Sequence, residues 1–203
     1  MHYKISAPQP TSHFLNIELL LDIRDETEMI LRLPSWRPGR YEIGNFAKNI
    51  KSFDVRDQSG ALLAFRKVSK DAWELKLNGA KTVSIRYNYF AAKLDAGSCW
   101  LDEEQVYINP VHCLLYVEDR MHEPCQLELL VPSSYKVATS LKEKGRLRFF
   151  SEDYHELVDS PLIASANLLY NSYTVQGIQF HIWFQGNVNP NWRKILKDFQ
   201  SLT

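Results

Sequence analysis

Three residues come closest to a known catalytic motif: His155, Glu156 and Asp159. Their spacing is that of the zinc-binding His-Glu-x-x-His helix, with Asp159 where the second histidine belongs. That chemistry needs two metal ligands one helical turn apart and a glutamate beside them as a base. Pro161 follows directly after Ser160, and proline disfavours helix in the residue before it. We therefore expect a strand end or a turn here, and no metal site.

The cysteines are the next candidates for chemistry. Cys99, Cys113 and Cys125 make an odd count without Cys-x-x-Cys spacing, which fits neither a disulfide framework nor a zinc ribbon. We expect reduced, mostly buried thiols. His112 beside Cys113 and His122 near Cys125 offer metal ligands, but core thiols and surface imidazoles explain these pairs better.

Other catalytic signatures are missing from the sequence. It contains no Gly-x-Ser-x-Gly elbow, no Gly-x-Gly-x-x-Gly loop and no Walker A sequence, so it gives no support for a serine hydrolase or a nucleotide-binding protein. The acidic run Asp102, Glu103 and Glu104 is expected to lie in a solvated loop.

The charge balance bears on partners and location. Lys plus Arg number 24 and Asp plus Glu number 24, which gives a formal net charge of zero. A neutral chain has no overall attraction to nucleic acid or to anionic membranes. No apolar run approaches the roughly 18 residues of a membrane span, and the N-terminus lacks the basic and apolar regions of a secretory signal. We expect a cytoplasmic protein with neither nucleic acid nor membrane as partner.

Alternation of apolar and polar residues with period two dominates the chain and predicts strands with one buried face. Residues 15–23 and 29–33 are expected to form one hairpin, and the strands around Asn78-Gly79 a second. A third hairpin is expected over 168–175 and 178–184, with its turn at Gln176-Gly177. Roughly a dozen short strands with regular turns predict an all-β fold, an antiparallel β-sandwich.

The last segment breaks this pattern and predicts a short C-terminal α-helix. Asn191 is a candidate N-cap, and the apolar residues that follow stand at i, i+3, i+4 and i+7, which makes one helix face: Trp192, Ile195, Leu196 and Phe199. This face either folds back on the sandwich or belongs to a further domain. Because the sequence stops at Thr203 without a C-cap signal, we expect a sandwich over 1–187 and the start of a truncated helical domain over 188–203.

Aromatic residues are the remaining candidates for binding. Five Trp and ten Tyr on a β scaffold suggest a stacking platform for sugar, although most Trp and Tyr in strands belong to the core. Burial of Trp36, Trp73 and Trp100 would exclude such a platform. Trp36 differs because it stands in a loop beside Pro38 and Gly39. An aromatic side chain on such a turn either fastens its own loop or faces a partner.

At this loop the sequence resembles a known family. Residues 33–43, Leu-Pro-Ser-Trp-Arg-Pro-Gly-Arg-Tyr-Glu-Ile, together with 46–50, are similar to the Leu-Pro-x-Trp-x-Pro-Gly-x-Tyr block of the glycyl aminopeptidase family of zinc metallopeptidases. These are PDZ-containing relatives of the aminopeptidase N group. The likeness continues through 108–110 and 159–161 to the closing strand and helix, so it covers nearly the whole chain.

The resemblance implies that the chain is the family's non-catalytic N-terminal β-sandwich domain. The zinc, its His-Glu-x-x-His ligands and the downstream glutamate are then expected in a missing thermolysin-like catalytic domain, so no catalytic, metal or cofactor residue is assigned in this chain. The expected partners are that domain and, indirectly, a peptide substrate. By analogy with related aminopeptidases, the contacts to the substrate cleft or the other domain are expected at Trp36, Arg37, Tyr41 and Asn109.

Two other functions stay open from the sequence. One is a carbohydrate- or peptide-binding β-sandwich module without enzymatic activity, which predicts a row of coplanar exposed aromatics. The other is a self-contained interaction domain, which predicts that the C-terminal helix packs tightly on its own sandwich. If the helix face instead lacks its partner, it could pair two copies of the fragment into a dimer.

Overall fold

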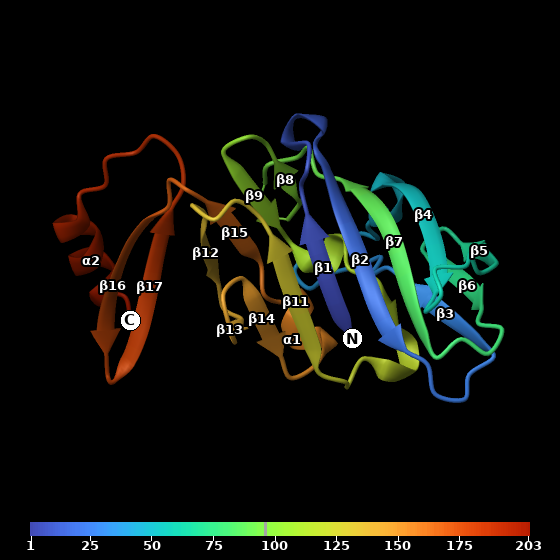
Figure 1. Ribbon diagram of the computed structural model, residues 1–203. Coiled ribbons are helices and arrows are strands. Elements are labelled where there is room, and N and C mark those ends of the chain that lie inside the picture. Colours follow the sequence, from blue (N-terminus) through green and yellow to red (C-terminus); the bar gives the residue numbers. More distant parts are fainter. Residues whose placement is uncertain (96) are drawn as a thin grey trace.

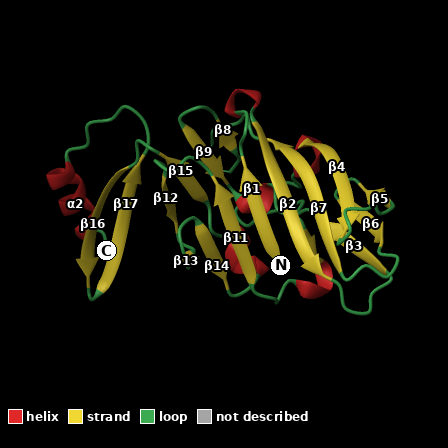
Figure 2. Cartoon of the chain, viewed as in Figure 1, coloured by secondary structure: helices red, strands yellow, loops and turns green. Residues whose placement is uncertain are grey.

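The computed structural model describes residues 1–95 and 97–203, and it shows a β-sandwich followed by a separate hairpin and helix (Figures 1 and 2). One layer of the sandwich is a seven-stranded sheet. Its strands lie in the order β13 (Lys142–Glu143), β14 (Arg148–Ser151), β11 (Cys125–Leu130), β1 (His2–Ser6), β2 (Phe14–Asp22), β7 (Thr82–Phe90) and β4 (Ile50–Asp57).

The opposite layer consists of two four-stranded sheets. The first has the order β10 (Tyr116–Val117), β3 (Glu28–Arg32), β6 (Ala72–Lys76) and β5 (Phe65–Ser69). The second has the order β12 (Lys136–Thr139), β15 (Leu162–Ser165), β9 (Gln105–Ile108) and β8 (Trp100–Leu101). The short helices of the sandwich are η1 (Pro10–Ser12), η2 (Phe46–Asn49), η3 (Pro110–His112), η4 (Glu118–Arg120) and α1 (Tyr154–Val158).

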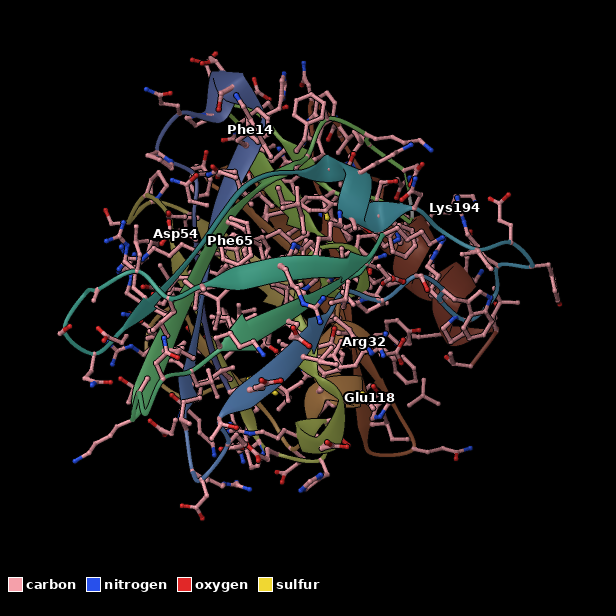
Figure 3. The ribbon with its side chains drawn as sticks, turned by 90° about the vertical axis from the view of Figure 1, so that its right-hand side faces the viewer. Phe14, Arg32, Asp54, Phe65, Glu118 and Lys194 are labelled. Carbon is pink, nitrogen blue, oxygen red and sulfur yellow. The ribbon has the colours of Figure 1, made fainter. Side chains whose placement is uncertain are left out.

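The all-β prediction is confirmed, and the alternation marks the buried faces correctly. In β2, the side chains of Leu15, Ile17, Leu19 and Leu21 are buried and their neighbours are less so. One face of each sheet meets the shared core because alternate side chains of a strand point to opposite sides. At the edge of the first four-stranded sheet, Arg32 of β3 and Glu118 of η4 form an ion pair of 2.9 Å (Figure 3).

Two of the three predicted hairpins are wrong. β2 pairs with β1 and β7, whereas β3 pairs with β6 and β10, so the first predicted pair lies in opposite layers. At Asn78-Gly79 both residues have the positive φ of the predicted turn, 49° and 77°, yet β6 and β7 also lie in opposite layers. Alternation shows only which face of a strand is buried. Two successive strands can bury those faces side by side in one sheet or from opposite layers of the same core, so alternation does not distinguish the two arrangements.

The third hairpin is confirmed. β16 (Leu169–Val175) and β17 (Ile178–Phe184) pair in register, and Gln176 and Gly177 have φ of 50° and 81°. The predicted helix is also present as α2 (Trp192–Gln200), and the Oδ1 atom of Asn191 accepts a hydrogen bond from the Lys194 amide. α2 lies against β16, and none of its side chains is buried. The predicted boundary after residue 187 stays a prediction.

An irregular segment, 113–115, crosses the core between η3 and β10 and joins the two four-stranded sheets. Its three carbonyl groups accept hydrogen bonds from buried tyrosine hydroxyls: Cys113 from Tyr87 (2.7 Å), Leu114 from Tyr154 (2.7 Å) and Leu115 from Tyr3 (2.8 Å). The Leu115 amide donates back to the Tyr87 hydroxyl at 3.3 Å. Burial raises the pKa of all three tyrosines well above its ordinary value, so the hydroxyls stay protonated donors.

No helix in the described part of the chain is long and apolar enough to span a membrane.

We predict that Tyr87→Phe lowers the free energy of unfolding by about 2–4 kcal/mol, because it leaves both the Cys113 carbonyl and the Leu115 amide without their partner. Urea unfolding followed by tryptophan fluorescence measures this loss. The matched control is Tyr135→Phe, which removes a hydroxyl bonded to the exposed Glu103 carbonyl, where water replaces it. Equal losses in the two variants would contradict the prediction.

Candidate functional site

The loop that carries the family-like block lies between β3 and η2 and is closed by its own hydrogen bonds. The Gly44 amide donates to the Ser35 carbonyl at 2.6 Å, and the Trp36 indole N–H donates to the Arg40 carbonyl at 2.6 Å. Trp36 therefore fastens its own loop, yet 53% of it remains exposed. Tyr41 is fully exposed and has no ring contact within the described residues.

The side chain of Arg37 extends away from this loop and packs against Gly97 in the loop before β8. A Cβ atom added at Gly97 would collide with the Arg37 guanidinium, so the arginine occupies space that only glycine leaves free. The Arg37 Nε atom is buried and has no hydrogen-bond partner within the described residues. The Arg37 guanidinium therefore places a positive charge beside the loop before β8, and it forms no ion pair within the described residues.

Asn109 is held by its backbone between two thiols. Its amide donates to the Sγ atom of Cys99 at 3.4 Å, and its carbonyl accepts from Cys99 at 3.6 Å and from Cys113 at 3.9 Å. Only 4% of Asn109 is exposed, and within the described residues its carboxamide forms no hydrogen bond. The prediction of free, buried cysteines is confirmed for all three, Cys125 included.

The stretch around His155 was expected to be a strand end or a turn, and this is wrong: it forms the one-turn helix α1. The Asp153 carboxylate caps it by accepting a hydrogen bond from the Glu156 amide at 2.8 Å. Pro161 restrains only Ser160, which already lies beyond the end of the helix at Val158. The Tyr154 hydroxyl fastens α1 to the core-crossing segment.

These elements enclose a pocket of about 580 Å³. Two of the four predicted contact residues, Arg37 and Asn109, line it together, whereas Trp36 and Tyr41 do not. Sequence reasoning missed the other members of the wall, although the resemblance over 159–161 was a signal for part of it. They are Pro38, Val111, His155, Glu156, Val158, Asp159 and Pro161.

The pocket combines both charges with apolar surface. Arg37 supplies a positive charge, and the exposed carboxylates of Glu156 and Asp159 supply negative ones. The free carboxamide of Asn109 can both donate and accept a hydrogen bond, as a peptide group also does. The arrangement can bind a polar, peptide-like group from both sides.

A second pocket, of about 640 Å³, lies near the N-terminus and is a weaker candidate. Its buried Arg120 already forms a two-pronged ion pair with Glu123, at 2.9 and 2.8 Å, and donates to the Asp22 carbonyl at 2.7 Å. These groups are satisfied within the protein and leave nothing unpaired for a ligand.

His112 lies beneath the loop rather than on the surface, where it was expected. Only 4% of it is exposed, and its ring stacks on Phe46 with 3.9 Å between centroids. Burial, with the charges of Arg37 and Arg40 as the next causes, lowers the pKa of His112 to about 4. Lys93 also lowers this pKa and Asp95 opposes the shift, so the imidazole is neutral at pH 7.

The residues of the site do not fit a metal ion. Across 1–95 and 97–203, no three His, Cys, Asp or Glu side chains lie close enough together to hold one. His155 and Asp159, one helical turn apart in the near-match to the zinc motif, therefore lack the further ligands that zinc requires.

Trp36, Trp73 and Trp100 do not form the row that a sugar platform needs. Trp73 is buried to 96% beneath the Lys67 ammonium group, which lies 4.9 Å from the ring centroid. Trp100 is half-buried and donates to Asp102 at 2.7 Å, while Trp36 stands alone on its loop. The three lie on β6, β8 and the β3–η2 loop.

We predict that stability falls as the pH is lowered from about 6.5 toward 4, because unfolding lets His112 take up a proton that the folded protein refuses until about pH 4. His112→Gln should flatten this slope between pH 7 and 5 in urea unfolding, above the range where carboxylates titrate. His122→Gln, which removes an exposed imidazole, is the control. An unchanged slope in His112→Gln would contradict the prediction.

Comparison with known proteins identifies a family to which the chain is similar. Residues 2–166 match the family described as the Peptidase M61 N-terminal domain. No curated protein matches. Among solved structures, an aminopeptidase N family protein from Idiomarina loihiensis is 26% identical, with a TM-score of 0.92 over 99% of this chain and 35% of its own. An M1 zinc metallopeptidase variant from Deinococcus radiodurans, bound to a Tyr-Ser-Ala substrate, is 14% identical, with a TM-score of 0.48 over 100% of this chain and 52% of its own.

The chain therefore spans about a third of the Idiomarina protein's length. The family match covers the whole sandwich, from β1 to the residue after β15, and it includes every residue that lines the pocket. The chain belongs to the Peptidase M61 N-terminal domain family.

Proposed function

We propose that this chain is the non-catalytic N-terminal domain of a zinc metallo-aminopeptidase, that it packs on the catalytic region, and that it forms part of the wall of the substrate cleft. This requires a longer polypeptide, the parent protein, of which the chain is one part. The observation that carries the proposal is the pocket formed by Arg37, Asn109 and α1.

The chemistry of this pocket suits a peptide. Asn109 presents a carboxamide that has no hydrogen-bond partner within the described residues and lies in the wall of the pocket, where a ligand or water can pair with it. Arg37 suits a carbonyl or carboxylate oxygen, and Glu156 and Asp159 suit an amino group. Apolar surface from Pro38 and Val111 lowers the local dielectric and strengthens these contacts.

In this proposal the hydrolytic chemistry belongs to the other part of the parent protein. Zinc held there would polarise the peptide carbonyl and activate a water molecule. The residues of this chain bind and orient the substrate and exclude water from one side of it. A preference for glycyl substrates, which rests on the family-like block around Trp36, is part of the same proposal. So is a cytoplasmic location, which rests on the three free, buried cysteines.

The first test asks whether the chain alone is an enzyme. We predict that the purified 203-residue chain contains no stoichiometric zinc and does not hydrolyse a glycyl-aminoacyl substrate. Metal analysis by mass spectrometry and a fluorogenic aminopeptidase assay measure this, with the parent protein as positive control. One zinc ion per chain, or turnover by the chain alone, would refute a non-catalytic role.

The second test asks whether the pocket contacts substrate. In the parent protein, Asn109→Ala and Arg37→Ala should each raise KM about fivefold to tenfold, the value of one hydrogen bond, with kcat nearly unchanged. Gly97→Ala should act in the same direction because its methyl group displaces the Arg37 guanidinium. The control is Ile43→Ala, which alters an exposed residue of the same loop outside the pocket. Unchanged KM in all three pocket variants would exclude a role in the cleft.

A further inference from the structure

The C-terminal part of the chain contains a long stretch without charge. Residues 160–192 include no Asp, Glu, Lys or Arg, although charged residues make up 24% of the whole chain. The stretch includes all of β16 and β17. A hairpin that faces water on both edges is expected to carry charges, because they prevent its free backbone groups from pairing with other chains.

The edge strands of the sandwich follow that rule. β5 carries Arg66 and Lys67, and Val68 between these charges and the strand end is exposed. Figure 3 views this edge, with Phe65 labelled on β5. The other edge strands longer than two residues are charged as well: β4 contains Lys51, Asp54, Arg56 and Asp57, and β12 contains Lys136. The hairpin is thus the exception within one molecule.

Within the described residues, β16 and β17 pair only with each other, so each has one open edge. Register places Leu169, Tyr173, Phe180 and Phe184 on one face, and Trp192 of α2 contacts Phe184 there with 5.4 Å between ring centroids. α2 lies mainly against β16 and reaches β17 through Trp192, and within the described residues no strand pairs along the free edge of β17. α2 covers this apolar face only in part, because Ile178 at the start of β17 is 62% exposed.

Few contacts fix this unit to the sandwich, and Figure 1 shows it at one end of the molecule beyond β12. The Idiomarina crystal structure nevertheless superimposes with a TM-score of 0.92 over 99% of this chain, so the hairpin and α2 hold the same place there. The whole match, sandwich included, covers 35% of the Idiomarina protein. The remaining polypeptide is the available source of the contacts that hold the hairpin.

We propose that the open edge of β17 accepts a β-strand from the catalytic region of the parent protein, so that the hairpin is the first part of a sheet completed by that region. This inference rests on the proposed function, since it takes its partner from there. Main-chain hydrogen bonds along Ile178–Phe184 would supply the affinity, and the exposed apolar side chains of the hairpin would be covered at the same time.

Hydrogen–deuterium exchange with mass spectrometry tests this directly. In the 203-residue chain alone, amides of β17 should exchange at least tenfold faster than those of the central strands β2 and β7. In the parent protein, β17 should gain at least tenfold protection. Equal exchange of β17 in the two proteins would overturn the proposal. Protection that grows with the concentration of the chain alone would also overturn it, because a second copy would then occupy the edge.

A pair of matched variants separates edge pairing from general stability. Gln179→Lys adds a charge to β17 at an exposed position, and Val68→Lys adds the same charge to the exposed edge strand β5. In the parent protein, Gln179→Lys should reduce the protection of β17 at least tenfold, while Val68→Lys should leave it unchanged. Equal effects, or none, would contradict strand addition at β17.

The two proposals fail in different ways. Protection of β17 in the parent protein together with unchanged KM in the Asn109 and Arg37 variants would refute the cleft role and leave strand addition standing. Raised KM in those variants together with an unprotected β17 would refute strand addition and leave the cleft role intact.

Discussion

The fold depends on satisfying backbone groups that lie where no strand can reach them. Residues 113–115 cross the centre of the sandwich, and a buried carbonyl without a hydrogen bond costs about 1–3 kcal/mol. Three tyrosines from three different elements, Tyr3, Tyr87 and Tyr154, supply the missing donors. The two four-stranded sheets can therefore be joined through the core, and both can pack against one continuous seven-stranded sheet.

The same crossing positions the candidate site. η3 leads into the crossing segment, and Tyr154 fastens α1 to it, so the floor and one wall of the pocket are anchored to the centre of the molecule. The opposite wall is a loop that closes on itself through Trp36 and reaches the pocket through Arg37. A rigid floor at Asn109 faces a more exposed loop, which is the usual division between a scaffold and the residues that bind.

Sequence reasoning succeeded where the physical signal is local. Alternation located the buried faces, Gln176-Gly177 located a hairpin, and the spacing from Trp192 to Phe199 located α2. It failed where one local pattern fits both a hairpin and a connection between layers. At Asn78-Gly79 the predicted turn is present, but it connects strands of opposite layers. Arg37 and Asn109 were paired only through family resemblance, because nothing in their spacing shows that Gly97 leaves room for the guanidinium.

The hairpin poses the same problem of unpaired backbone groups as the crossing segment, at the surface instead of the core. Within the sandwich, open edges coexist with charges such as Arg66, which keep strands in water and discourage pairing. Residues 160–192 lack such charges, so they have neither the internal donors of the crossing segment nor the protection of the edge strands. The strand proposed to add to β17 would supply backbone partners at this edge, as the three tyrosines do for the crossing segment.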